Sequence, residues 1–154
     1  MSIDAAMMDL AIAEAEKGRD SGGIPIGAVL AVGDRVLGAG HNQRVQLGSA
    51  IRHGEMDALE RAGRHPATTY AQATMYTTLS PCSMCTGAIL LYGIGRVVLG
   101  ENVTFQGSED LLRANGVEVV DLDDERCIDM METFIADHPE LWNEDIGEPD
   151  EADE

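Results

Sequence analysis

Three residues in two short segments constrain the fold of this chain more than any other feature of its sequence. His53 begins the segment His-Gly-Glu, and the cysteines of Pro-Cys-Ser-Met-Cys follow at Cys82 and Cys85. Imidazole nitrogen and thiolate sulfur are typical ligands of a transition-metal ion. If these residues share one ion, the fold must bring together two segments that lie 29 positions apart in the sequence.

The rest of the sequence alternates between strand-like and helix-like segments after an initial hairpin. We predict strands over residues 26–32, 35–39, 73–78, 96–100 and 117–122. We predict helices over residues 5–17, 53–62, 82–92 and 108–114, one capped by Asp123 or Asp124 that runs to Ala136, and a short one from Pro139. Asp4 is the expected N-cap of the first helix. This alternation predicts an α/β fold, a three-layer α/β/α domain with a mixed sheet.

The length of 154 residues suits a single domain, which we place at residues 1–148. Residues 149–154 form an acidic tail that we expect to be disordered. The sequence has neither a long apolar run nor the basic and then apolar start of a signal peptide. We therefore expect a soluble, cytoplasmic protein that is not associated with a membrane.

The acidic residues are concentrated near the C-terminus. The formal net charge is −18, and residues 121–154 carry 15 acidic side chains against the single basic Arg126. Such a surface repels phosphate backbones and anionic membranes. The charge therefore argues against nucleic acid as a partner, but it allows a small neutral ligand.

The His and Cys residues are placed for catalysis as well as for binding a metal. Cys82 and Cys85 lie one helical turn apart at a predicted helix start, where the helix dipole favours thiolates. With His53 they make three protein ligands, which leaves the fourth position of a tetrahedral Zn²⁺ for a water or hydroxide. Glu55 follows the histidine by two residues and can exchange protons with that water. This His-x-Glu and Pro-Cys-x-x-Cys pattern is the signature of zinc nucleobase deaminases.

Other interpretations of the same residues remain open at this point. A Cys-x-x-Cys pair also occurs in redox centres and in structural zinc sites, and His41, His65 or His138 could supply a fourth, closing ligand. A cysteine nucleophile with His53 as its base is another alternative. Cys127 fits an ordinary packed thiol better than a ligand.

Beyond these elements, the chain resembles the fungal-type cytosine deaminases of the cytidine deaminase-like superfamily over nearly its whole length. The matching segments are Gly22–Gly27, Gly40–Asn42, His53–Glu55, Tyr76–Ile89, Gly100–Val103, and Trp142 with Glu144–Glu148. The zinc elements alone indicate the superfamily, and the segment from Trp142 to Asp145 narrows it to this group. The resemblance implies a five-stranded mixed sheet between helices and a homodimer.

The resemblance also implies a role for particular residues. Zinc, one ion per chain, would be held by His53, Cys82 and Cys85, and Glu55 would act as the proton shuttle. The substrate would contact Asn42, Gly54, Ile26, Leu79, Ser80, Phe105, Trp142 and Asp145. Considered without the family, Asn42 fits a turn residue, Trp142 a core anchor and Asp145 a solvated acid.

The reaction that the resemblance implies is the hydrolytic deamination of free cytosine to uracil and ammonia, a step of pyrimidine salvage. The alternatives are deamination of another small heterocycle, such as guanine, isocytosine or a creatinine-like ring, deamination of tRNA adenosine, and a structural zinc module without catalysis. Two features depart from the family pattern. Arg52 stands where an aliphatic residue is expected, and the segment 106–110 is less basic and slightly shorter.

Overall fold

The computed structural model describes residues 1–149 of the chain. The strands are β1 (Gly27–Val32), β2 (Arg35–His41), β3 (Thr74–Thr77), β4 (Arg96–Leu99) and β5 (Glu118–Asp121). The helices are α1 (Ile3–Asp20), α2 (Arg44–Leu47), α3 (Gly54–Ala62), α4 (Ala67–Ala71), α5 (Ser83–Tyr92), α6 (Glu109–Ala114), α7 (Glu125–Asp137) and α8 (Pro139–Asp145). Beyond Pro149, the tail predicted to be disordered lies outside the described residues.

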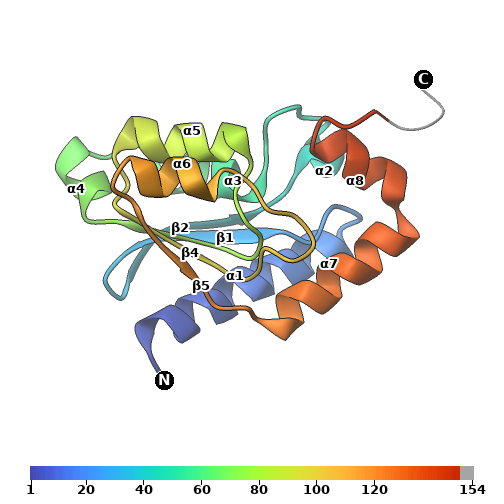
Figure 1. Ribbon diagram of the computed structural model, residues 1–154, viewed down its shortest axis with the longest axis horizontal. Coiled ribbons are helices and arrows are strands. Elements are labelled where there is room, and N and C mark those ends of the chain that lie inside the picture. The colour runs from blue at the N-terminus through green and yellow to red at the C-terminus, as the bar shows by residue number, and fades with distance from the viewer. Residues whose placement is uncertain (150–154) are drawn as a thin grey trace.

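The five strands form one mixed sheet in the order β2-β1-β3-β4-β5. The strand β1 pairs antiparallel with β2 and with β3, whereas β3, β4 and β5 run parallel. Helices α3, α4, α5 and α6 cover one face of the sheet, and α1 and α7 cover the other, while α2 and α8 lie at one end (Figure 1). The predicted three-layer α/β/α fold with a five-stranded mixed sheet is confirmed.

Helices bury both faces of the sheet, and consecutive strand residues point to opposite faces, so each strand contributes side chains to both cores. On β1, Leu30 packs with Met75 and Ile89 under α3 and α5, whereas Val29 packs with Met8 and Tyr76 against α1. A third cluster lies at the end of the sheet that carries α8 and contains Ile24, Ile26, Leu79, Met131, Phe134 and Trp142. This third cluster supports the cavity described below.

Three local predictions were wrong. The N-cap of α1 is Ser2, whose hydroxyl accepts from the Ala5 N–H, because Asp4 instead binds Arg96 through both carboxylate oxygens. Residues 40–49, for which we predicted neither a strand nor a helix, contain the end of β2 and the short helix α2. The helix α4 was not expected at all. Its five residues are too few to give a clear helical periodicity.

The connections at the end of the sheet place the motif residues. The helices α3 and α5 begin directly after His53 and Cys82, which are their N-cap residues. The N-termini of α3 and α5 therefore meet at one edge, where a site can form.

Within residues 1–149, no helix is both long enough and apolar enough to cross a membrane.

Candidate metal centre and binding cavity

The three predicted metal ligands meet at the N-termini of α3 and α5. The Nδ1 atom of His53 lies 3.4 Å from the Cys82 sulfur and 3.7 Å from the Cys85 sulfur. Within the described part of the chain, these are the only three His, Cys, Asp or Glu side chains grouped closely enough to share an ion. A closed site with His41, His65 or His138 as a fourth ligand is therefore not formed among these residues.

The spacing of the donor atoms fits a tetrahedral Zn²⁺. With Zn–S near 2.3 Å and Zn–N near 2.05 Å, the nitrogen-to-sulfur edge of a tetrahedron is about 3.6 Å. The two nitrogen-to-sulfur distances of 3.4 and 3.7 Å bracket that value. One imidazole and two sulfurs also form a donor set typical of catalytic zinc, which leaves the fourth position open.

The orientation of the His53 ring also suits a ligand. Its Nε2 atom lies 3.2 Å from the backbone carbonyl oxygen of Asp145, which can only accept a hydrogen bond. Nε2 therefore carries a proton, and Nδ1 is the nitrogen that faces the two sulfurs. A metal-binding histidine is usually held in this way by an acceptor on its far nitrogen. Here the acceptor comes from α8, the last helix of the chain.

The pKa values of the two cysteines are shifted in opposite directions. A hydrogen bond from Cys85, together with His53, lowers the pKa of Cys82 to about 4 despite its burial. Cys85 donates that hydrogen bond and is fully buried, so its own pKa is raised. A dication supplies the positive charge that lets both sulfurs ionise. The donor set therefore fits Zn²⁺ in charge as well as in geometry.

Glu55 lies in the first turn of α3 and is buried beside the cysteines. Burial and the charge of Cys82 raise the pKa of Glu55 to about 7. Burial lowers the pKa of His53, but the hydrogen bond to Cys82 and the charges of Asp145 and Glu55 outweigh it and raise the pKa to about 9. A carboxyl group that titrates near neutral pH is suited to proton transfer.

A cavity of about 290 Å³ adjoins the ligands. It is lined by Ile26, His53, Glu55, Leu79, Ser80, Cys82, Phe105, Trp142, Asp145 and Ile146. Phe105 and Trp142 meet edge to face with ring centroids 5.8 Å apart and form an aromatic corner. Small-molecule sites are typically lined by apolar and aromatic side chains with a few polar groups, and this lining follows that pattern. The aromatic and aliphatic walls therefore suit a flat ring.

The remaining predicted site residues, Asn42 and Gly54, lie beside the cavity and do not line it. Asn42 is fully buried, and its Nδ2 donates to the Asp145 carboxylate at 3.0 Å, while its Oδ1 accepts from the Arg44 N–H. The amide orientation is thereby fixed, with one N–H still available. Gly54 packs against the Ile26 carbonyl, which a Cβ atom at that position would approach to 3.1 Å.

Ile146 is a wall residue that the sequence analysis missed. It follows Trp142 by four positions and so lies one helical turn further along the same face. This periodicity was the available signal. In the structure it also packs on the cluster that contains Trp142.

Two buried glutamates shape the loop that carries Phe105, and they too were missed. Glu101 accepts hydrogen bonds from the N–H groups of Val103 and Thr104 and from the Thr104 hydroxyl. Glu109 accepts from the Ser80 hydroxyl at 2.6 Å, and that hydroxyl accepts in turn from Gly107. Nothing in the sequence distinguishes these two acids from solvated ones, because their burial depends on the path of the loop.

The departure at Arg52 has a structural explanation. Its Nε donates to the Asp57 carboxylate at 2.8 Å, and Arg61 binds the other oxygen of that carboxylate at 3.0 Å. Asp57 is fully buried and also accepts from the His41 backbone N–H. Arg52 therefore turns away from the metal ligands and neutralises a buried carboxylate behind them.

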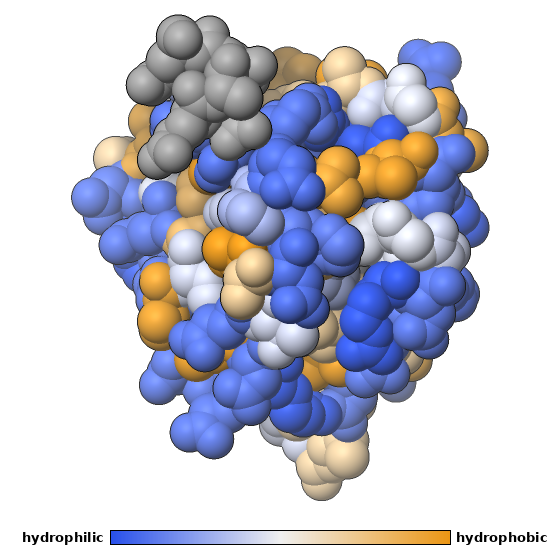
Figure 2. Space-filling model, turned by 90° about the vertical axis from the view of Figure 1, so that its right-hand side faces the viewer, coloured by the Kyte–Doolittle hydropathy of each residue, from blue (hydrophilic) through white to orange (hydrophobic). Residues whose placement is uncertain are grey.

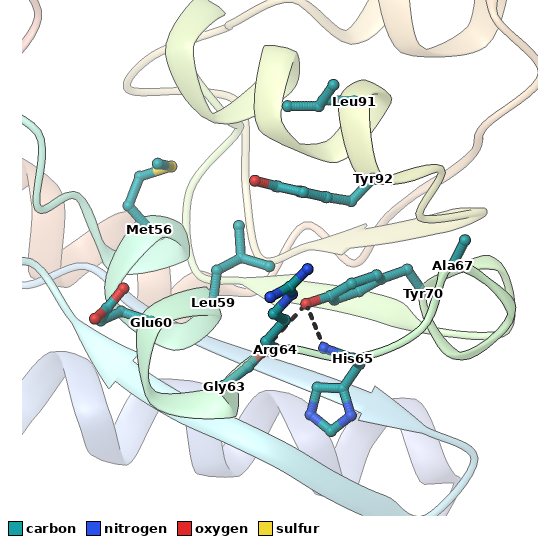
Figure 3. A pocket seen from close by; sticks show the side chains of 10 residues that line it. All are labelled: Met56, Leu59, Glu60, Gly63, Arg64, His65, Ala67, Tyr70, Leu91 and Tyr92. Atoms are coloured by element: carbon teal, nitrogen blue, oxygen red, sulfur yellow. Dashed lines mark hydrogen bonds between the residues drawn. The ribbon is translucent and has the colours of Figure 1, made fainter.

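A second and larger cavity, of about 1310 Å³ and open to solvent, lies over α3, α4 and α5. Tyr70 and Tyr92 stack at 5.3 Å along it, and the Tyr70 hydroxyl is hydrogen-bonded to Gly63 and His65 (Figure 3). Leu91 at its rim is 74% exposed. None of the predicted site residues lines this cavity.

The face on the side of α7 and α8 has a different character. Figure 2 shows that hydrophilic side chains cover most of it and that hydrophobic ones form small, separate patches. The exposed apolar side chains of α5 lie in the opposite helical layer from α7, above the sheet (Figure 1).

Comparison with known proteins agrees with this site. The family model described as the cytidine and deoxycytidylate deaminase zinc-binding region matches residues 1–101. A cytosine deaminase of Candida albicans is 61% identical over 142 residues, which cover 92% of this chain and 95% of that protein.

Less similar proteins carry the names of other substrates. A tRNA-specific adenosine deaminase of Streptococcus pyogenes is 39% identical over 106 residues, 68% of this chain and 67% of that protein. The solved structure of a guanine deaminase from Nitrosomonas europaea matches with a TM-score of 0.72 at 20% identity, over 88% of this chain and 86% of that one. At that identity the likeness extends to the fold alone.

Proposed function

The chain belongs to the cytidine and deoxycytidylate deaminase family, and from that premise we propose that it converts free cytosine and water into uracil and ammonia. The observation that carries this choice is the likeness to the Candida albicans cytosine deaminase over nearly the full length of both chains. Helix α8 supplies Trp142 and Asp145 to the cavity. A small cavity with two aromatic walls agrees with a free base as the substrate.

His53, Cys82 and Cys85 hold the Zn²⁺ ion in this proposal, and when bound the ion supplies Lewis-acid activation of water. Glu55 is the proton carrier. It accepts a proton from the water that adds to C4 of cytosine and delivers it to the ring nitrogen N3. A second proton passes through Glu55 from the hydroxyl added to C4 to the departing amine, so that the C4 carbonyl forms, one water is consumed and one ammonia is released. Its burial keeps bulk water from these transfers.

The remaining wall residues position the base. The Phe105 and Trp142 rings enclose its faces, and Ile26 and Leu79 complete an apolar wall. We assign the exocyclic amine to the Asp145 carboxylate, and the released ammonia to the backbone carbonyl of Ser80.

The C2 carbonyl group of the base lies on the other side of N3 from the amine. The free N–H of the Asn42 amide and the backbone N–H of Gly54 are its proposed donors. Both polar substituents of the ring are then recognised by hydrogen bonds, which distinguishes cytosine from rings of other polarity.

The protein is proposed to act as a cytoplasmic homodimer in pyrimidine salvage. Leu91 and Tyr92, at the end of α5, are 74% and 46% exposed, and they line the open cavity of Figure 3. Apolar side chains gathered in one place favour a protein interface over free solvent. A second copy of the chain on this face would cover them and leave the mouth of the smaller cavity near α8 free.

A nucleic-acid substrate is less well supported. The tRNA-specific relative is similar over 68% of the chain, compared with 92% for the cytosine deaminase. Residues 121–154 are strongly acidic and oppose a phosphate backbone. The structure offers no comparable argument against guanine, isocytosine or a creatinine-like ring, so these rings belong in the test.

The test is ammonia release by the zinc-loaded protein on cytosine, cytidine, isocytosine, guanine, adenine and creatinine. We expect a clear preference for cytosine and a fall in kcat of about 10²- to 10⁴-fold for Glu55→Gln, with zinc content unchanged. Preference for another ring would overturn the substrate assignment and keep the zinc chemistry. Near-normal turnover by Glu55→Gln would overturn the role of Glu55, and silence on every ring would overturn the catalytic function.

A further inference from the structure

Arg44 is the least exposed cation among the ion pairs of residues 1–149, with 11% of its side chain accessible. It begins α2, and its guanidinium binds both carboxylate oxygens of Glu144 on α8, at 2.6 and 2.7 Å. Its Nε donates to the Ala50 carbonyl at 2.7 Å, which fixes the guanidinium from the other side. A planar fork held at three positions is a rigid contact between α2 and α8.

The same guanidinium also reaches the cavity wall. Its Nη1 lies 3.3 Å from Oδ1 of Asp145, whose side chain is only 2% exposed. That oxygen also accepts from Asn42 at 3.0 Å and lies 3.5 Å from Nε2 of His53. Arg44 is thus the permanently charged partner of a buried carboxylate, and a buried carboxylate without such a partner is costly.

The polar side-chain contacts that join α8 to distant parts of the described chain come from three residues. Asn42 and His53 are two of them, and both already have a role in binding substrate or metal. Arg44 is the third, and it lines neither the cavity nor the metal centre. Arg44 can therefore hold α8 in place while Asn42 binds substrate and His53 binds the metal.

We propose that Arg44 is a positioning residue that seats α8 over the cavity and orients the Asp145 carboxylate toward the substrate. Its effect on KM rests on the proposed function, because Asp145 is there the acceptor of the substrate amine. Its effect on α8 does not, because the contact with Glu144 exists without substrate.

The seating of α8 can be measured without substrate, since Trp142 is the only tryptophan of the chain and lies on this helix. Acrylamide quenching of its fluorescence reports how closely α8 is held. We expect Arg44→Met to raise the quenching constant about twofold and KM about tenfold, with kcat within about threefold and zinc content unchanged. The backbone N–H that orients Asn42 is retained in this variant.

Two further variants separate the contacts of Arg44 with Glu144 and Asp145. Glu144→Gln removes the charge from one pair only, so we expect slightly higher quenching and a KM within about twofold of the parent protein. The exchange Arg44→Glu with Glu144→Arg restores the pair between helices but places a carboxylate at position 44 beside Asp145. We expect this double variant to regain the low quenching and to keep the raised KM.

Arg126→Met is the matched control, because Arg126 pairs with Asp124 and Asp9 away from the cavity. We expect it to change neither quenching nor KM. An unchanged quenching constant in Arg44→Met would overturn the seating role. Recovery of KM in the double variant would overturn the role in orienting Asp145. If the parent protein does not deaminate cytosine, the quenching measurements still decide the first of these points.

Discussion

The two sides of the cavity are built in different ways. On the metal side, His53, Cys82 and Cys85 come from the first turns of two helices, and their positions follow from short motifs in the sequence. On the opposite side, Trp142 and Asp145 come from α8, about 90 residues after the histidine, and Asp145 is held by contacts with distant parts of the chain.

This difference separates chemistry from recognition. The family model describes a zinc-binding region, and zinc deaminases use the metal to activate water beside a glutamate that carries protons. The match to that model ends at residue 101, before α8 begins. In our proposal, the side that selects the ring is therefore the one that motifs describe least.

The largest effect is expected from a change of the metal side. Cys82→Ser replaces a thiolate by a poorly ionised hydroxyl, so we expect zinc to be lost and activity to fall at least ~10³-fold, about 4 kcal/mol of transition-state stabilisation. Metal analysis and an ammonia assay measure both quantities. Cys127→Ala is the control, because Cys127 is buried between α7, α1 and the sheet and takes no part in the metal site. If Cys82→Ser kept full zinc and activity, Cys82 would not be a ligand.

A change of the α8 side should leave the metal in place. Trp142→Ala removes one aromatic wall of the cavity, and we expect KM to rise about 30-fold, near 2 kcal/mol, with zinc content unchanged. Thermal unfolding should also show a lower stability, because Trp142 is buried in the third core cluster. Trp142→Phe should recover most of the affinity. Loss of zinc in Trp142→Ala with the fold intact would contradict the separation of the two sides.

The loop that carries Phe105 joins the two sides of the cavity. We expect a change in this loop to have an effect on KM and stability that is smaller than that of Trp142→Ala. A Cβ atom at Gly107 would lie 1.8 Å from the Pro81 carbonyl oxygen, so Gly107→Ala must displace this loop. We expect a loss of about 1–3 kcal/mol in stability. A displaced Phe105 should also raise KM several-fold.

Gly87→Ala is the matched control, because its Cβ would meet no atom within 4 Å in helix α5. We expect it to be neutral or to stabilise by about 0.5–1 kcal/mol. If Gly107→Ala and Gly87→Ala changed stability and KM equally, the loop would not be tightly packed at Gly107. Urea unfolding and steady-state kinetics measure both variants.

The sequence predicted the sheet and the metal side well because both depend on local patterns. Strand periodicity gave all five strands within two residues, and the spacing from His53 to Cys82 and Cys85 gave the ligands. The wrong N-cap shows the limit of such patterns. Ser2 and Asp4 are equally good caps by residue type, and only the long-range contact with Arg96 decides between them.

The contacts behind the cavity could not be read from residue type. Glu101, Glu109 and Asp57 are acids in a chain with many acids, and their burial depends on partners distant in sequence. The positions of Trp142 and Asp145 at the cavity came from the family resemblance, because an aromatic and an acid in a short helix fit the surface equally well. Resemblance therefore contributed most where the contacts are least local.

The smallest effect is expected far from both sides, where Asp4 joins α1 to the sheet. Arg96 binds both of its oxygens at 2.7 Å, and this hydrogen bonding, with that of Tyr76, lowers the pKa of Asp4 below its ordinary value. The folded state therefore favours the ionised form, and its contribution is complete above the unfolded pKa near 4 and is lost as the pH falls through the lowered value. We expect Asp4→Asn to cost about 1 kcal/mol at pH 7 and much less at pH 3, with KM unchanged at neutral pH. Urea unfolding at the two pH values measures this, and a loss that does not depend on pH would mean that packing, not charge, holds this end of α1.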